Sequence, residues 1–320
     1  MTSQYEDIVV ETRSGVREIV HQGCISISTV DGEIAATGDT DCYVSLRSLA
    51  KPFIVSFLLD KYLEGQTFSE DEIALMSSSH NGEPMHVEIL HRLLSRYEIP
   101  VDALKCGSHP RFRWNSRVRP DSNNCSGKHA AYLISCVVND LPQQSYLEGK
   151  HPISAYIKER FEEILGCDIE IGVDGCSIPT FAVPLKKVSQ LFAHFSVATD
   201  NTLSRVREAH LQFPDVVGGS DCLDSYLIRK FGLNAKSGSD GIWAIGIADQ
   251  RIGISGKVYS GSEAAIEHAL LHVLRNLNLV EPQNDSFMKG FYERPRLSWA
   301  GHEVGVVKCL LGGFPGDSES

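Results

Sequence analysis

The stretch Arg47-Ser48-Leu49-Ala50-Lys51-Pro52 places a serine and a lysine three positions apart at the predicted start of a helix. Side chains at this spacing lie on one face of a helix and can contact each other. A neutral lysine amine one turn away can accept the serine proton, which makes the hydroxyl a nucleophile without any histidine. Bringing a lysine pKa from about 10.4 to near 7 costs roughly 4–5 kcal/mol, so the pair would have to be desolvated.

The residues after this pair favour its burial. Phe53-Ile54-Val55 and Phe57-Leu58-Leu59 follow directly and predict a helix that is packed into a core. A Ser-x-x-Lys pair also occurs by chance on exposed helices, where both side chains are solvated and inert. Polar residues on a buried helix need a partner or a function, so the apolar context favours the catalytic interpretation.

Length and composition describe a protein with an ordinary core and an acidic surface. The chain has 320 residues, 42% of them hydrophobic, and a formal net charge of −11. The negative charge argues against nucleic acid or an anionic membrane as a partner. No stretch approaches the ~18 apolar residues of a membrane span, and Met1–Asp7 has no basic or apolar targeting pattern, so we expect a cytoplasmic protein. Nine scattered cysteines suit reduced thiols better than a disulfide framework.

Strand-like patterns occupy both ends of the chain. Alternation at Cys24–Val30 precedes an Asp31-Gly32 turn, and residues 242–257 form a second predicted hairpin. Residues 303–311 form a final predicted strand. We therefore expect an α+β fold in which the terminal strands share an antiparallel sheet and helices flank it.

The middle of the chain is mainly helical in pattern. Ser69 and Glu72 form a predicted capping box at the start of one helix. Residues 277–301 are predicted to be irregular. We predict a single domain, 1–320, with a helical lobe inserted at about 53–240 into a sheet lobe. The other predicted helices cover residues 53–62, 84–97, 129–138, 152–165, 184–195, 201–213 and 262–276.

Three polar clusters fall where helices or strands are predicted to begin or end. Ser77–Glu83 surrounds His80 with hydroxyl and amide groups, although such a loop can also serve only to cap the next helix. Asn123–His129 leads into a helix whose free amides could hold an anion. Cys125, Lys128 and the later Asp174–Pro179 turn with Cys176 allow a metal site, although two residues at helical spacing do not make one alone.

A further lysine is expected near the serine helix. Proteins that use Ser-x-x-Lys often place a second lysine on a neighbouring strand. Lys257 ends the predicted 242–257 hairpin, and Lys236 in Lys236-Ser237-Gly238 competes for the same role. We choose Lys257 because it lies inside a strand pattern, although the usual fate of a lysine at a strand end is exposure.

Taken in order, these motifs resemble the rhizobial-type L-asparaginases, also called the asparaginase II or thermolabile family. The resemblance covers nearly the whole chain and rests on Arg-Ser-x-x-Lys-Pro at 47–52, Ser-His-x-Gly-Glu at 79–83, Cys-Ser-Gly-Lys-His at 125–129, Asp-Gly-Cys-x-x-Pro at 174–179 and the lysine strand at 251–257. It implies a fold like serine β-lactamases and β-lactamase-like glutaminases, hydrolysis of L-asparagine, and a homodimer.

The resemblance also implies a set of site residues. Two Ser-Lys pairs map onto Ser48 with Lys51 and Ser79 with Lys257, where Ser79 is preferred over its serine neighbours because it directly precedes His80. One zinc ion maps onto Cys125, Lys128 and Cys176. For the substrate carboxylate we choose Arg47, and for its ammonium Glu83 or Asp174, with His80 and His129 lining the same pocket.

Two other activities remain open from the sequence. A β-lactamase or transpeptidase would use the same Ser48 and Lys51, and a glutaminase differs only by one methylene of substrate, worth ~1–3 kcal/mol of discrimination. A protein that only binds zinc or acts as a scaffold, with inert Ser-Lys pairs, is the alternative to any enzyme.

Overall fold

The chain begins with β1 (Glu6–Arg13) and β2 (Val16–Thr29), two long strands at the centre of an eight-stranded sheet. The structure is a computed structural model that describes residues 5–107, 119–199, 201–280, 286–292 and 294–312. The strand order is β10-β11-β1-β2-β9-β8-β7, with β3 also paired to β2, and all pairings are antiparallel. The remaining strands are β3 (Glu33–Thr37), β7 (Asn234–Gly238), β8 (Ile242–Ile247), β9 (Ile252–Val258), β10 (Pro295–Leu297) and β11 (Glu303–Cys309).

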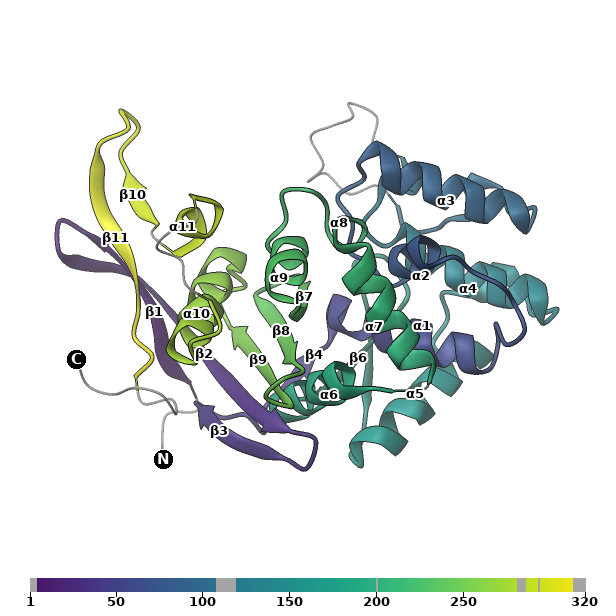
Figure 1. Ribbon diagram of the computed structural model, residues 1–320, viewed down its shortest axis with the longest axis horizontal. Helices are drawn as coiled ribbons and strands as arrows, with labels where there is room; N and C mark the ends of the chain where they lie inside the picture. Colours follow the sequence, from purple (N-terminus) through teal and green to yellow (C-terminus); the bar gives the residue numbers. More distant parts are fainter. Residues whose placement is uncertain (1–4, 108–118, 200, 281–285, 293, 313–320) are drawn as a thin grey trace.

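Both ends of the chain therefore contribute to one sheet, as the sequence predicts. The chain leaves this sheet after β3 and returns at β7, and the segment between forms a mainly helical insert beside it (Figure 1). The insert contains η1 (Arg47–Ala50), α1 (Lys51–Asp60), α2 (Glu70–Met76), α3 (Pro84–Arg96), η2 (Val101–Ala103), η3 (Pro120–Ser122), α4 (Ser126–Val138), η4 (Gln143–Ser145), α5 (Pro152–Leu165), α6 (Leu185–Val197), α7 (Thr202–Gln212), α8 (Pro214–Val217) and α9 (Leu223–Phe231).

A second, three-stranded sheet within the insert was not expected. Its order is β4 (Tyr43–Ser45), β6 (Pro179–Pro184) and β5 (Glu170–Val173). Strands this short carry too few residues for a period of two to be recognised. The small sheet fixes the residues on either side of it, because β4 leads into η1 and the turn from β5 to β6 carries Asp174 and Cys176.

Helices cover both faces of the larger sheet. A Cβ at Gly253 of β9 would lie 1.9 Å from the backbone oxygen of Ser189 in α6, so only glycine permits this close approach. A Cβ at Gly256 would meet Ile266 of α10 (Glu263–Asn276) at 2.7 Å. Residues 253 and 256 point to opposite faces of a strand, so α6 and α10 pack on opposite sides.

The segment 277–301 is more regular than the sequence indicated. It holds α11 (Ser286–Tyr292), with Met288 buried, and β10, which pairs with β11. The prediction of an irregular stretch was wrong because tertiary packing, rather than local pattern, forms these short elements. Mixed helices and antiparallel strands confirm the predicted α+β class.

Candidate active site

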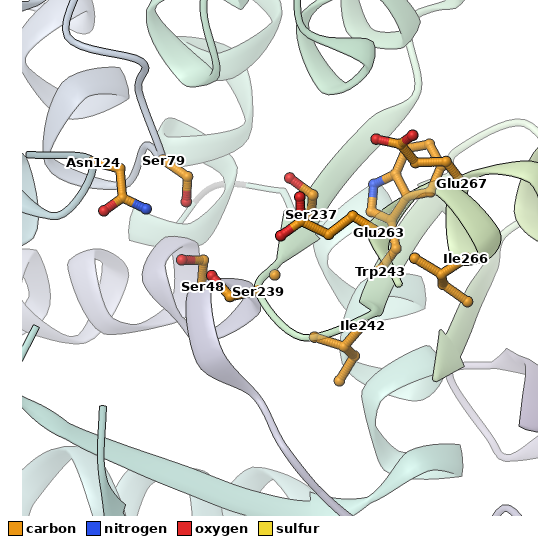
Figure 2. A pocket seen from close by; sticks show the side chains of 11 residues that line it. Ser48, Ser79, Asn124, Ser237, Ser239, Ile242, Trp243, Glu263, Ile266 and Glu267 are labelled. Carbon is orange, nitrogen blue, oxygen red and sulfur yellow. The ribbon is translucent and has the colours of Figure 1, made fainter. Parts of the chain in front are cut away.

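A cavity of about 160 Å³ lies between the helical insert and the larger sheet, lined on the insert side by Ser48, Ser79 and Asn124. Figure 2 shows that the two serine side chains lie on one side of this cavity and the α10 carboxylates on the other. The insert and the sheet thus each supply part of the wall. The remaining lining residues are Ser237, Gly238, Ser239, Ile242, Trp243, Glu263, Ile266 and Glu267.

Ser48 is placed by an unusual backbone conformation of the residue before it. Arg47 has φ of 48°, in the left-handed region that a residue with a Cβ seldom adopts. Such a conformation costs of order 1–3 kcal/mol and is found preferentially at functional sites. It turns the chain from β4 into η1, so that Ser48 is 6% exposed and faces the cavity.

Lys51 is completely buried and makes three hydrogen bonds. Its Nζ lies 2.7 Å from the carbonyl oxygen of Ser78, 2.8 Å from that of Asn124 and 3.1 Å from Oγ of Ser79. The two carbonyl groups can only accept, whereas the hydroxyl can donate or accept. The lysine side chain is thus joined to a second serine of the cavity, whereas no hydrogen bond between Nζ of Lys51 and Oγ of Ser48 occurs within the described residues.

The structure does not show the predicted pairing of Ser79 with Lys257. Lys257 Nζ donates to the carbonyl oxygen of Asp240 and lies 5.9 Å from the centre of the Tyr259 ring, outside the residues that line the cavity. The physical reason is strand order. Lys257 is on β9 in the interior of the sheet, whereas β7 is the strand that packs against η1.

Lys236, the competing lysine, is fully buried on β7, the strand that packs against η1. Its Nζ lies 3.1 Å from the carbonyl oxygen of Ser237 and 3.5 Å from Oδ2 of Asp224. Burial lowers the pKa of Lys236 to about 8; the carboxylate of Asp224 opposes this shift and the nearby Lys51 adds to it. Neither lysine lines the cavity, but Lys236 is affected by the charge of Lys51 and is therefore the stronger candidate for a second lysine.

Arg47, predicted to bind the substrate carboxylate, is held by carboxylates of the protein itself. Its Nε lies 2.7 Å from Oδ1 of Asp174, and its Nη1 forms an ion pair with Oδ2 of Asp240. The side chain does not line the cavity. Asp174 is equally committed, since it also accepts from the Gly175 amide at 2.8 Å. These pairs hold Arg47, the residue directly before Ser48, and both carboxylates already have a cationic partner.

The predicted metal ligands Cys125 and Cys176 do come together. Their Sγ atoms and a carboxylate oxygen of Asp174 all lie within 4.8 Å of one another. Lys128 is buried beside them, with Nζ 3.4 Å from Oδ2 of Asp174. Two thiolates bound to one zinc ion lie roughly 4 Å apart, so two thiols, a carboxylate and an amine match a tetrahedral site after small adjustments. Asp174 therefore lies beside the three predicted ligands as a further candidate donor.

His80, Glu83 and His129 lie away from the cavity lining. His80 Nε2 is 2.8 Å from Oγ of Ser126, and burial lowers the pKa of this histidine well below its usual value. His129 Nδ1 is 2.7 Å from the hydroxyl of Tyr146. Glu83 accepts hydrogen bonds from the backbone and side chain of Ser220. Each of the three therefore fastens parts of the insert to one another.

Sequence reasoning missed the acidic side of the cavity. Glu263 and Glu267 of α10 line it, and Glu267 is paired with Arg294 at 2.6 Å. Burial raises the pKa of Glu267, and Arg294 partly opposes that shift. Trp243 also lines the cavity, and its buried Nε1 has no hydrogen-bond partner in the described part of the chain. The spacing of the two glutamates on a helix was the only available signal, and it is common on exposed helices.

The comparison with known families decides the relationship. A family model described as L-asparaginase II matches residues 9–309. The chain belongs to the L-asparaginase II family. This family assignment makes the protein an amidohydrolase and confirms the resemblance drawn from the motifs. A search of curated proteins finds no match.

Solved structures similar to this L-asparaginase II family member include a protein named Mglu, with 13% identity over 82% of this chain and 69% of that one and a TM-score of 0.50. A Bacillus glutaminase is 15% identical over 81% and 91% of the two chains, with a TM-score of 0.44. A β-lactamase from Mycobacterium bovis is 11% identical over 81% and 95%, with a TM-score of 0.38. At these identities the likeness concerns the fold alone. None of the described helices is both long and apolar enough to cross a membrane.

Proposed function

We propose that this member of the L-asparaginase II family hydrolyses L-asparagine to L-aspartate and ammonia through an acyl-enzyme formed on Ser48. The observation that carries the proposal is the meeting of Ser48 and Ser79 in one cavity, with the buried amine of Lys51 3.1 Å from Oγ of Ser79. A buried amine beside the serines of one cavity is an arrangement that can activate a nucleophile for amide hydrolysis.

Lys51 is proposed as the base. A neutral amine has two N–H groups and one lone pair, which matches two carbonyl acceptors and one hydroxyl. Positive charges on Lys51 and Lys236 would repel each other, and Asp224 beside Lys236 favours a charge there. In this proposal Lys236 carries the positive charge and Lys51 accepts the proton of Ser48.

The reaction then proceeds in two steps. Oγ of Ser48 attacks the side-chain amide carbon while Lys51 takes its proton, and Ser79, hydrogen-bonded to Lys51, passes a proton to the leaving ammonia. Water then attacks the β-aspartyl ester, with the same groups moving the proton in reverse. The developing oxyanion is proposed to bind the Ser48 amide at the start of η1 and the backbone of Gly238–Ser239 across the cavity.

The other end of the cavity suits the amino-acid end of the substrate. Glu263 and Glu267 supply carboxylates for an α-ammonium group, and Nε1 of Trp243 is a buried donor without a partner that suits an α-carboxylate. We assign these roles in place of Glu83, Asp174 and Arg47 because those three residues do not line the cavity.

A zinc ion is proposed at Cys125, Asp174, Cys176 and Lys128, where the donor set fits it. When bound, zinc supplies a Lewis acid or a structural clamp. Because Asp174 holds Arg47, the cluster also orients the residue before Ser48. A homodimer remains a proposal from the family resemblance, and a cytoplasmic location remains a proposal from the sequence pattern.

The experiment is an assay of ammonia release with asparagine and glutamine, run beside a nitrocefin assay for β-lactamase activity. We expect release from asparagine and its loss by at least about 100-fold in Ser48→Ala. A matched control is Ser45→Ala, which alters a serine of β4 that does not line the cavity. Full activity in Ser48→Ala, or hydrolysis of glutamine or nitrocefin in preference to asparagine, would refute the proposal.

A further inference from the structure

Two cysteines meet outside the candidate active site, where the larger sheet contacts the segment that leads from it into the helical insert. Cys24 lies in β2, and Cys42 immediately precedes β4. Their Sγ atoms are 3.5 Å apart, and both are free thiols. A disulfide needs about 2.05 Å, so the sulphur atoms would have to approach by about 1.5 Å. They are separated by seventeen intervening residues in the chain.

The surroundings distinguish the two thiols. Cys24 is fully buried, whereas Cys42 is partly exposed. The hydroxyl of Tyr259 donates to Sγ of Cys42 at 2.9 Å. Hydrogen bonding from Cys24 and from Tyr259 lowers the pKa of Cys42 to about 7, against the effect of burial. The same contact with Cys42, together with burial, raises the pKa of Cys24 well above its usual value.

We propose that Cys24 and Cys42 form a peroxide-sensitive dithiol that closes to a disulfide. The Cys42 thiolate attacks one oxygen of hydrogen peroxide, the O–O bond breaks, and hydroxide leaves with the proton that Cys42 released, as water. The resulting sulfenic acid condenses with the Cys24 thiol, the S–S bond forms and a second water leaves. Two thiols are oxidised and one peroxide is reduced, which gives a disulfide and two waters.

The bond would join two parts of the fold that meet near the candidate site. Cys42 is already held to the start of α6, because its carbonyl oxygen accepts from the amide of Leu185 at 3.1 Å. It lies five positions before Arg47, whose conformation places Ser48. The disulfide would therefore tie the centre of the larger sheet to the chain segment that leads to the nucleophile. This inference does not depend on the substrate of the enzyme.

The test uses full-length protein equilibrated with zinc chloride and treated with a small excess of hydrogen peroxide. We expect a mass decrease of about 2 Da, a peptide linking Cys24 to Cys42 in a non-reducing digest, and reversal by dithiothreitol. The oxidised protein should unfold at a higher temperature than the reduced protein. Both changes should vanish in Cys24→Ser and Cys42→Ser. They should persist in Cys167→Ser, a matched control at another partly exposed cysteine.

A second variant tests the hydrogen bond to the thiolate. Tyr259→Phe removes the donor to Cys42 and should slow the reaction with peroxide several-fold while still allowing the same disulfide. The inference is overturned if the only linked peptide joins Cys125 to Cys176, the thiols of the candidate metal site. It is also overturned if Cys42 is oxidised to sulfinic acid without linkage, or if Cys42→Ser loses the same mass as the wild type.

Discussion

Two lysines on strands of one sheet differ in what surrounds their amines. Lys236 is sealed between Asp224 and the backbone of Ser237, close enough to Lys51 to be affected by its charge. Lys257 is turned toward Asp240 and the ring of Tyr259. The two lysines are two strands apart, with β8 between β7 and β9, and Lys236 is the one affected by the charge of Lys51.

Substitution of these lysines tests the assignment directly. Lys236→Met is expected to reduce kcat/KM for asparagine by about 100-fold or more, because it removes the positive charge beside Lys51. Lys257→Met should leave it nearly unchanged. The pKa of Lys236 is lowered to about 8, so its charge is present below pH 8 and is lost as pH rises. Wild-type kcat/KM should therefore fall above about pH 8.

Lys236→Arg supplies the control for charge. An arginine stays protonated throughout this pH range, so the alkaline decrease should disappear while part of the activity is kept. If Lys257→Met were inactive and Lys236→Met active, Lys257 rather than Lys236 would be the second lysine of the site.

At the level of single elements, sequence pattern worked best where local chemistry decides the structure. The capping box of Ser69 and Glu72 is present at the start of α2, and the predicted helix 262–276 is α10 almost to the residue. Prediction failed for β5 and β10, because strands of four and three residues are too short for a period of two to be recognised. In β2 the alternating Ser26 and Ser28 are buried, and their hydroxyl groups form hydrogen bonds with Ser189 of α6 at 2.8 and 2.7 Å.

In the candidate site, too, local patterns could be recognised from the sequence, whereas features set by the tertiary fold could not. Adjacent residues in one motif, such as Ser48 and Lys51 or Cys125 and Lys128, could be recognised from spacing. The choice between Lys236 and Lys257 depended on strand order, which no local pattern contains. Glu263 and Trp243 belong to the cavity only because α10 and β8 meet the insert there.

Glu72 provides an element-scale prediction about stability. Its side chain is buried and pairs with Arg96 at 2.6 Å, which ties α2 to α3. Burial raises the pKa of Glu72, but Arg96 and the Ser69 amide outweigh this and lower it. Glu72→Gln should reduce the free energy of unfolding at pH 7 by about 1–3 kcal/mol, measured by urea denaturation.

The pH dependence follows from the direction of that shift. Because the folded-state pKa lies below the unfolded value of about 4.3, the contribution is present above that pH and is lost as pH falls through the folded pKa. The difference between wild type and Glu72→Gln should therefore shrink below about pH 4. Glu159→Gln, an exposed change on α5, should have little effect at any pH. Equal stability of Glu72→Gln and wild type at pH 7 would contradict the prediction.

For the whole molecule, a metal at the Cys125 cluster would connect the start of α4 to the turn between β5 and β6. Removing it with a chelator is expected to lower the unfolding temperature, since a ligand that binds only the folded state stabilises it. We also expect KM for asparagine to rise more than kcat falls, because Ser-Lys chemistry needs no metal. Calorimetry, metal analysis and steady-state kinetics measure these changes.

Cys176→Ser should lose bound metal, whereas Cys167→Ser should retain it. Complete loss of kcat on chelation with asparagine still bound normally would show that the metal takes part in the chemistry.

The first helical turn of the insert, η1, packs against β7, the strand by which the chain returns to the sheet. Ser48 lies in η1 and Lys236 in β7, so both segments carry residues of the proposed machinery. Any opening and closing of the two halves of the molecule would hinge on these same positions. A substitution that makes these segments more flexible would then also displace Ser48. The catalytic rate and the rigidity of the connection between the two halves would therefore change together.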